Sequence, residues 1–212
     1  MIVVASTIVL GLFLLFGWII FSEMLQHRVW RRRVEQGDVG IVHALIEEAL
    51  GTWRKARPPR GLPTQLWSGV QGAQLVAVTA DSATLSASAE PAFRTEDGRR
   101  VQTSSALDEA TALAARIVDM MLYDVPNLRL DAVRVDVFST FTGADGAAVQ
   151  QPILTTTATR ADAEDVAWES LTPQEVLGRF ATRFALGANG QALPIPLDPI
   201  EGSLPEPAEG VA

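Results

Sequence analysis

The feature that most constrains this chain is an uncharged run of twenty residues, Ile2–Phe21, whose only polar side chains are those of Ser6 and Thr7. Twenty helical residues, at about 1.5 Å per residue, span about 30 Å, which is the thickness of the hydrocarbon core of a bilayer. The run therefore predicts a single N-terminal transmembrane helix, and we assign the anchor to residues 1–24.

A cleaved signal peptide is the main alternative interpretation of this run. A signal peptide carries a basic segment before a shorter apolar stretch and a cleavage site flanked by small residues after it. No basic side chain precedes the run, and the following segment, SEMLQHRVW, contains no such site. The sequence therefore favours an uncleaved anchor.

Four arginines and a tryptophan follow the run in the stretch HRVWRRR, residues 27–33. Positive charge beside a membrane span stays on the cytoplasmic side, and only the C-terminal flank of this run is basic. We therefore expect a single-pass protein of the cell membrane, with its N-terminus outside and its C-terminal domain in the cytoplasm. The residues expected at the membrane interface are Trp18, Arg28, Trp30, Arg31, Arg32 and Arg33.

The remainder of the chain is acidic, which limits what the arginines can bind. From Gly61 onward, nine arginines oppose twenty aspartates and glutamates, a balance of −11. A body of this charge repels phosphate, so no nucleic-acid partner is expected. A sensor of anionic lipid is a bolder interpretation, because each arginine near such a surface adds about 1 kcal/mol of attraction. Orientation of the span already explains the arginines, so lipid is expected as a partner of the N-terminal helix alone.

The composition excludes several kinds of chemistry. The chain has no cysteine, which removes disulfides, thiolate nucleophiles and thiolate metal sites. Its single lysine, Lys55, is not part of a phosphate-binding GK[ST] motif, and neither His27 nor His43 lies beside a G-x-S-x-G nucleophile elbow. No catalytic residue, no cofactor and no small-molecule substrate are therefore predicted.

Two groups of side chains could supply metal ligands. His43 lies one helical turn before Glu47, but a zinc site needs three or four ligands and no second histidine is near in sequence. The segment RADAEDVAWES gathers four carboxylates, those of Asp162, Glu164, Asp165 and Glu169. It lacks the mid-loop glycine and the final glutamate of a calcium loop, so a solvated loop is the favoured interpretation.

The segment after the arginines predicts an amphipathic helix. Apolar residues recur at spacings of three and four from Ile41 to Trp53, and two prolines, Pro58 and Pro59, end the pattern. The basic collar and this helix are assigned to residues 25–60. Two glutamates in the middle of the helix would be unfavourable against anionic lipid, so we expect the helix to pack on the domain that follows.

Residues 61–187 are assigned to a domain with two successive patterns of two strands and a helix. In the first, residues 73–79 and 83–90 alternate as a pair of strands, and a helix over residues 104–126 begins with a near capping box at Ser105. A further short strand at residues 92–94 leads to a tight turn at Asp97-Gly98.

In the second pattern, strands are expected within residues 130–143 and 148–160, with Pro152 marking an edge position or a bulge. A helix over Thr172–Gly187 follows, because Thr172 can cap it and Pro173 suits its first turn. The order β-β-α-β-β-α predicts an α+β fold, with a small antiparallel sheet that carries both helices on one face.

The C-terminal tail, residues 188–212, holds five prolines and no regular period. Part of it, LPIPLDPIEG, could adopt polyproline II, which partner proteins bind at a low ordering cost. The residues predicted to bind a partner are Pro194, Pro196, Leu197 and Pro199. As an alternative, the apolar residues of this segment could cover the chain's own domain.

Taken together, these features predict a membrane-anchored, non-catalytic protein. Its cytoplasmic α+β domain and proline-rich tail would bind partner proteins, as an accessory or assembly subunit of a membrane complex. A membrane-proximal hydrolase that uses the carboxylates of residues 162–169, with or without a metal, is one alternative. An exported, tethered domain is the other.

Overall fold

The computed structural model describes residues 38–143, 145–200 and 202. Almost all of them belong to one unit of the chain, Val39–Ala212. Within these described ranges, no helix has the length and hydropathy needed to cross a membrane. The predicted anchor and its interface residues lie outside the described residues: Trp18, Arg28, Trp30, Arg31, Arg32 and Arg33.

The described part of the chain begins with two helices, and groups of strands and helices follow. The helices are α2 (Val39–Lys55), α3 (Thr64–Gln71), α4 (Ala106–Asp119), α5 (Arg160–Glu164) and α6 (Pro173–Leu177), with a turn of π-helix, η1 (Met120–Asp124), after α4. The strands are β1 (Gln74–Val78), β2 (Ser82–Ser88), β3 (Ala92–Glu96), β4 (Arg99–Ser104), β5 (Ala132–Thr142), β6 (Ala148–Thr159), β7 (Ala181–Leu186) and β8 (Ala192–Leu193). The fold is α+β, as predicted.

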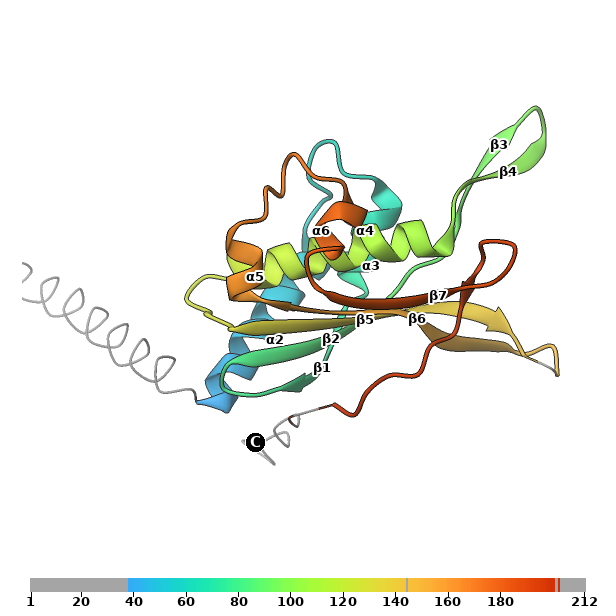
Figure 1. The fold of residues 1–212 in the computed structure, drawn as a ribbon. Helices are drawn as coiled ribbons and strands as arrows, with labels where there is room; N and C mark the ends of the chain where they lie inside the picture. Colours follow the sequence, from blue (N-terminus) through green and yellow to red (C-terminus); the bar gives the residue numbers. More distant parts are fainter. Residues whose placement is uncertain (1–37, 144, 201, 203–212) are drawn as a thin grey trace, which may run out of the picture. The chain divides into compact units, whose positions relative to one another are not determined.

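The main sheet is mixed, and the prediction of an antiparallel sheet was wrong. Its strand order is β1-β2-β5-β6-β7-β8, and β2 pairs with β5 in parallel while the other neighbours are antiparallel. Parallel neighbours need a crossover of a dozen or more residues, and the segment that contains α4 supplies it. Figure 1 shows α3, α4 and α6 together over one face of this sheet.

The core lies between α4 and the middle of the sheet. Ile117 of α4 is completely buried, and so are the alternate valines of β5 from Val133 to Val137. Because side chains alternate along a strand, Arg134 and Asp136 lie on the opposite face. Each apolar side chain of this size contributes about 1.5–3 kcal/mol when fully buried.

The helix α2 packs on the domain that follows it, as predicted. Its apolar face, which includes Val42, Ile46 and Leu50, is buried, and it contacts α3 and β1. Farther along the chain, the indole of Trp67 donates a hydrogen bond to the carbonyl oxygen of Ala56, at 3.0 Å. This bond ties the residues that follow α2 to α3.

The prediction of a helix over Thr172–Gly187 was wrong over most of its length. Thr172 caps it with a capping box, but the helix ends at Leu177 and the chain then forms β7. Phe184, which lies within the predicted helix, pairs instead with Leu154 of β6 and is half exposed. The order β-β-α-β-β-α is therefore incomplete, because β3, β4, β7 and β8 extend it.

The tail returns along the second face of the main sheet, in red in Figure 1. We call residues 194–200 the strap. The amide of Ile195 donates a hydrogen bond to the carbonyl oxygen of Pro152, at 2.9 Å. Just beyond the strap, a Cβ atom at Gly202 would lie 2.8 Å from the carbonyl oxygen of Val78 in β1. The tail thus runs from one edge of the sheet to the other.

Candidate functional site

A projecting hairpin is the most exposed ordered element of the described chain. Strands β3 and β4, with the turn between them, form a two-stranded sheet of their own, which we call the arm (residues 92–104). Asp97 and Gly98 form the turn with positive φ angles of 48° and 78°. Figure 1 shows the arm extending away from the other strands and helices.

The surface of the arm combines apolar and basic side chains. Phe93 is 44% exposed and Val101 is 41% exposed. The guanidinium of Arg100 lies 4.0 Å from the centre of the Phe93 ring, a cation–π contact, and Arg94 and Arg99 are also exposed. An isolated two-stranded hairpin is only marginally stable in water, so the arm depends on how firmly its two ends are held.

The end of the arm that follows β2 is held by Glu90. Its carboxylate accepts hydrogen bonds from the backbone amide of Thr140 at 2.9 Å, from the Thr140 hydroxyl at 2.6 Å and from the Ser139 hydroxyl at 3.3 Å. The amide of Ala89 also donates to the carbonyl oxygen of Phe138, at 2.9 Å. These bonds fasten the arm to β5.

The other end of the arm leads straight into α4. Ser105 accepts a hydrogen bond from the amide of Asp108, and the Asp108 carboxylate accepts one from the amide of Ser105, which makes the predicted capping box. This arrangement satisfies the free amides at the start of α4 and fixes the direction in which the chain leaves β4. The arm is therefore mounted rigidly at both ends.

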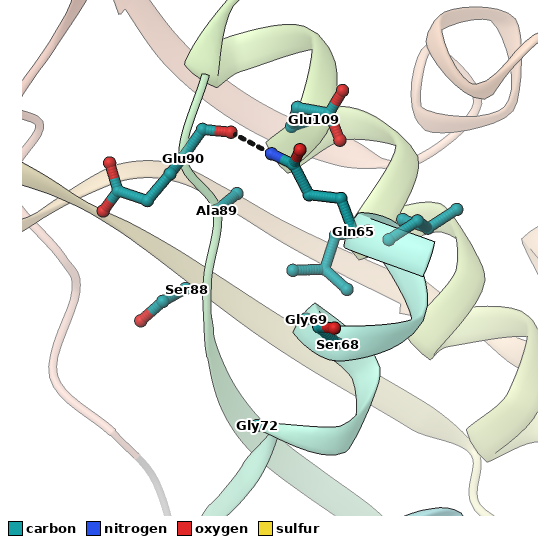
Figure 2. Close-up of a pocket in the computed structure, with 10 residues that line it drawn as sticks. Gln65, Ser68, Gly69, Gly72, Ser88, Ala89, Glu90 and Glu109 are labelled. Carbon is teal, nitrogen blue, oxygen red and sulfur yellow. Dashed lines mark hydrogen bonds between the residues drawn. The ribbon is translucent and has the colours of Figure 1, made fainter. Parts of the chain in front are cut away.

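A pocket of about 290 Å³ lies at the base of the arm, between α3, the end of β2 and α4 (Figure 2). The side-chain amide of Gln65 donates to the carbonyl oxygen of Glu90, at 2.8 Å. Gly69 lets α3 come close to α4, because a Cβ atom there would lie 2.8 Å from Leu113. Ser68 and Glu109 add polar groups to a lining that is otherwise mainly apolar.

A second hollow, of about 300 Å³, lies between α4, α6 and β7. Its walls are mainly apolar and are supplied by Leu107, Leu154, Leu177, Phe180 and Phe184, among others. In this respect it resembles the pocket beneath the arm, whose lining is also mainly apolar.

One of the four carboxylates of residues 162–169, that of Asp162, forms a local hydrogen bond at the start of α5. Asp162 accepts a hydrogen bond from the hydroxyl of Thr159, which caps α5. Among the described residues, no group of three or more histidines, aspartates and glutamates is placed to hold a metal ion. His43 and Glu47 lie on α2, and the structure brings no further ligand of that kind to them within the same ranges.

Another cluster of titratable groups lies where α4 meets η1. Arg116 forms ion pairs with Asp119 and, at 3.5 Å, with Asp124. Burial raises the pKa of Asp119, although the Arg116 guanidinium acts in the opposite direction. Because one arginine joins both carboxylates, we interpret this cluster as a clamp on the end of α4.

The predicted partner-binding residues of the tail lie on the strap. Pro194, Pro196 and Pro199 are exposed, whereas Leu197 is half-buried together with Ile195. The strap thus has an inner side against the sheet and an outer side that carries the prolines. Their binding to a partner stays a prediction.

The sequence reasoning foresaw the turn of the arm but missed the arm as a site. Asp97-Gly98 with a strand before it is a hairpin signal, yet the second strand, RRVQTS, has only Val101 as an apolar residue. Comparison with protein-family models, curated proteins and solved structures found no match to this chain.

Proposed function

We propose that this chain is a membrane-anchored, non-catalytic accessory subunit whose domain binds a partner protein through the arm. The observation that carries the proposal is a rigidly mounted hairpin that leaves Phe93 and Val101 exposed beside arginines. Burial of these side chains against another protein would explain why they are exposed in the unbound domain.

The chemistry of the arm favours a protein as the partner. Aromatic residues and arginine are enriched at the centres of protein interfaces and supply most of the binding energy there. The outer edges of β3 and β4 are not paired with any strand of the described residues, so an extended segment of a partner can add to them. The pocket beneath the arm offers a neighbouring polar contact.

The arm can be tested against a matched position elsewhere on the domain. We expect Phe93→Ala to weaken binding of the native partner by about 2 kcal/mol, or about thirty-fold, because this ring would lie at the centre of the interface. Val101→Ala should weaken it by about 1 kcal/mol, or about fivefold, because valine is a smaller contributor to such interfaces. Val149→Ala is the control, since Val149 is also a strand valine that is 41% exposed. The measurement is the amount of partner that co-purifies with the tagged full chain from detergent-solubilised membranes.

Two results would contradict the arm as the binding site. One is recovery of the same partner, in the same amount, with all three variants. The other is repeated recovery of the unsubstituted chain without any partner, under conditions where this chain is folded.

The membrane anchor is supported by the uncharged run Ile2–Phe21. We expect the full chain to stay in the membrane pellet after an alkaline wash, and a variant without residues 1–24 to move to the supernatant, because the run is long enough to span the bilayer. Protease added to intact cells should spare the domain. Digestion of the domain there, or a mature chain that begins after Phe21, would contradict this part of the proposal.

A further inference from the structure

The second face of the main sheet carries a preorganised guanidinium. Arg134 of β5 forms an ion pair with Asp136, with 2.9 Å between Nε and the carboxylate, and Asp136 also accepts a hydrogen bond from the hydroxyl of Thr155. Asp136 is 2% exposed, so its position is fixed by the sheet. The two terminal nitrogens of Arg134 are thereby left to point away from Asp136 and towards the strap.

Arg134 binds the strap through backbone atoms. Its Nη2 atom donates to the carbonyl oxygen of Asp198 at 3.2 Å, and its Nη1 atom lies 3.5 Å from that of Pro199. A third backbone contact joins Ile195 to Pro152, in which the Ile195 amide is the donor. Any extended peptide presents such carbonyl oxygens and amides, so these contacts select for an extended shape.

One contact recognises a side chain of the strap. Arg183 of β7 forms an ion pair with the carboxylate of Asp198, at 2.6 Å. The two side chains are 50% and 67% exposed. An ion pair in such a position contributes little net stability, because water and salt screen it. The strap is therefore held by a few backbone hydrogen bonds, two half-buried apolar side chains and one weak pair.

From these contacts we infer that the second face of the sheet is a peptide-binding site, which the strap occupies when no partner is present. Its ligand is an extended segment of another protein with two branched apolar residues, spaced as Ile195 and Leu197, followed by an acidic residue. The inference does not depend on the arm, which lies elsewhere on the domain.

The strap competes with such a ligand from within the same chain. A tethered segment has an effective concentration in the millimolar range, so a free peptide binds only weakly while the strap is intact. Reversing the charge of Asp198 replaces an attraction with a repulsion from Arg183 and favours release of the strap. The site then becomes available to an external peptide that still carries the acidic residue.

The test uses the full chain in detergent and two fluorescent peptides. One has the sequence of residues 192–202, and the other is identical except for a lysine in place of the aspartate that corresponds to Asp198. We expect Asp198→Lys to bind the acidic peptide about tenfold more tightly than the unmodified chain does. The variant loses a weak attraction between the strap and Arg183 and gains a repulsion of similar size, and both changes favour release of the strap. The reciprocal variant, Arg183→Glu, should bind the lysine peptide and not the acidic one.

The double variant, Arg183→Glu with Asp198→Lys, is the matched control. Its strap is held again by an ion pair of reversed sign, so it should bind the acidic peptide no better than the unmodified chain. Both altered side chains are at least half exposed, so the variants are expected to fold. Binding is measured by fluorescence anisotropy, and release of the strap by hydrogen exchange at the amide of Ile195.

Three results would overturn the inference. In the first, the Ile195 amide loses its protection in the Asp198→Lys variant, yet the acidic peptide does not bind. In the second, the amide stays protected in both single variants, so the strap is not displaceable. In the third, each single variant binds the two peptides equally, so the face does not recognise the acidic residue.

Discussion

Replacing Asp136 with alanine is expected to lower the free energy of unfolding by about 3–5 kcal/mol, because it breaks a buried ion pair from one side. The guanidinium of Arg134, only 14% exposed, would lose its partner, and the hydroxyl of Thr155 would lose its acceptor. Urea unfolding of the full chain in detergent, followed by tryptophan fluorescence, measures the difference.

The matched control for this variant is Asp124→Ala. Asp124 also pairs with an arginine, Arg116, but its side chain is 48% exposed and the distance is 3.5 Å. An exposed pair of this kind contributes less than about 1 kcal/mol. If Asp136→Ala and Asp124→Ala lowered the free energy of unfolding equally, the pair of Arg134 and Asp136 would not be buried as the structure has it.

Replacing Ile117 with alanine is expected to lower the free energy of unfolding by about 2–5 kcal/mol, because it removes a completely buried side chain between α4 and the sheet and leaves a cavity. Ile117→Val removes a single methyl group and should cost about 0.5–1.5 kcal/mol. The same urea experiment measures both variants.

Ile200→Ala provides the comparison for the core variant, because Ile200 is 41% exposed. Loss of an exposed isoleucine of this kind should change the free energy of unfolding by no more than about 0.5 kcal/mol. If Ile117→Ala lowered the free energy of unfolding as little as Ile200→Ala, α4 would not pack on β5 as the structure has it.

Local chemistry explains the elements that were predicted well. Ser105 and Asp108 lie three residues apart, and the apolar stripe of α4 recurs every three or four residues, so both signals act within a few turns of one helix. The hairpin of β5 and β6 is equally local, and the shift in register beside Pro152 is one of the two outcomes that a proline there allows.

The errors arose where distant segments decide the structure. The apolar spacing from Val176 to Phe184 fits a helix, but pairing with β6 satisfies the backbone of that strand and holds Phe184 opposite Leu154. The parallel pairing of β2 with β5 joins residues about fifty positions apart, and no short pattern specifies it. The bonds from Ser139 and Thr140 to Glu90, which mount the arm, span the same distance in sequence.

The way the arm is mounted has a consequence for how this protein can diversify. Its two ends are neighbours, since Ala92 pairs with Ser104 across the hairpin. Insertions whose ends lie close together at a surface leave the path of the surrounding chain unchanged. The segment between those ends can therefore be lengthened, shortened or exchanged without a change elsewhere in the fold. Related chains could change their choice of companion in this way, while the sheet beneath keeps the same architecture.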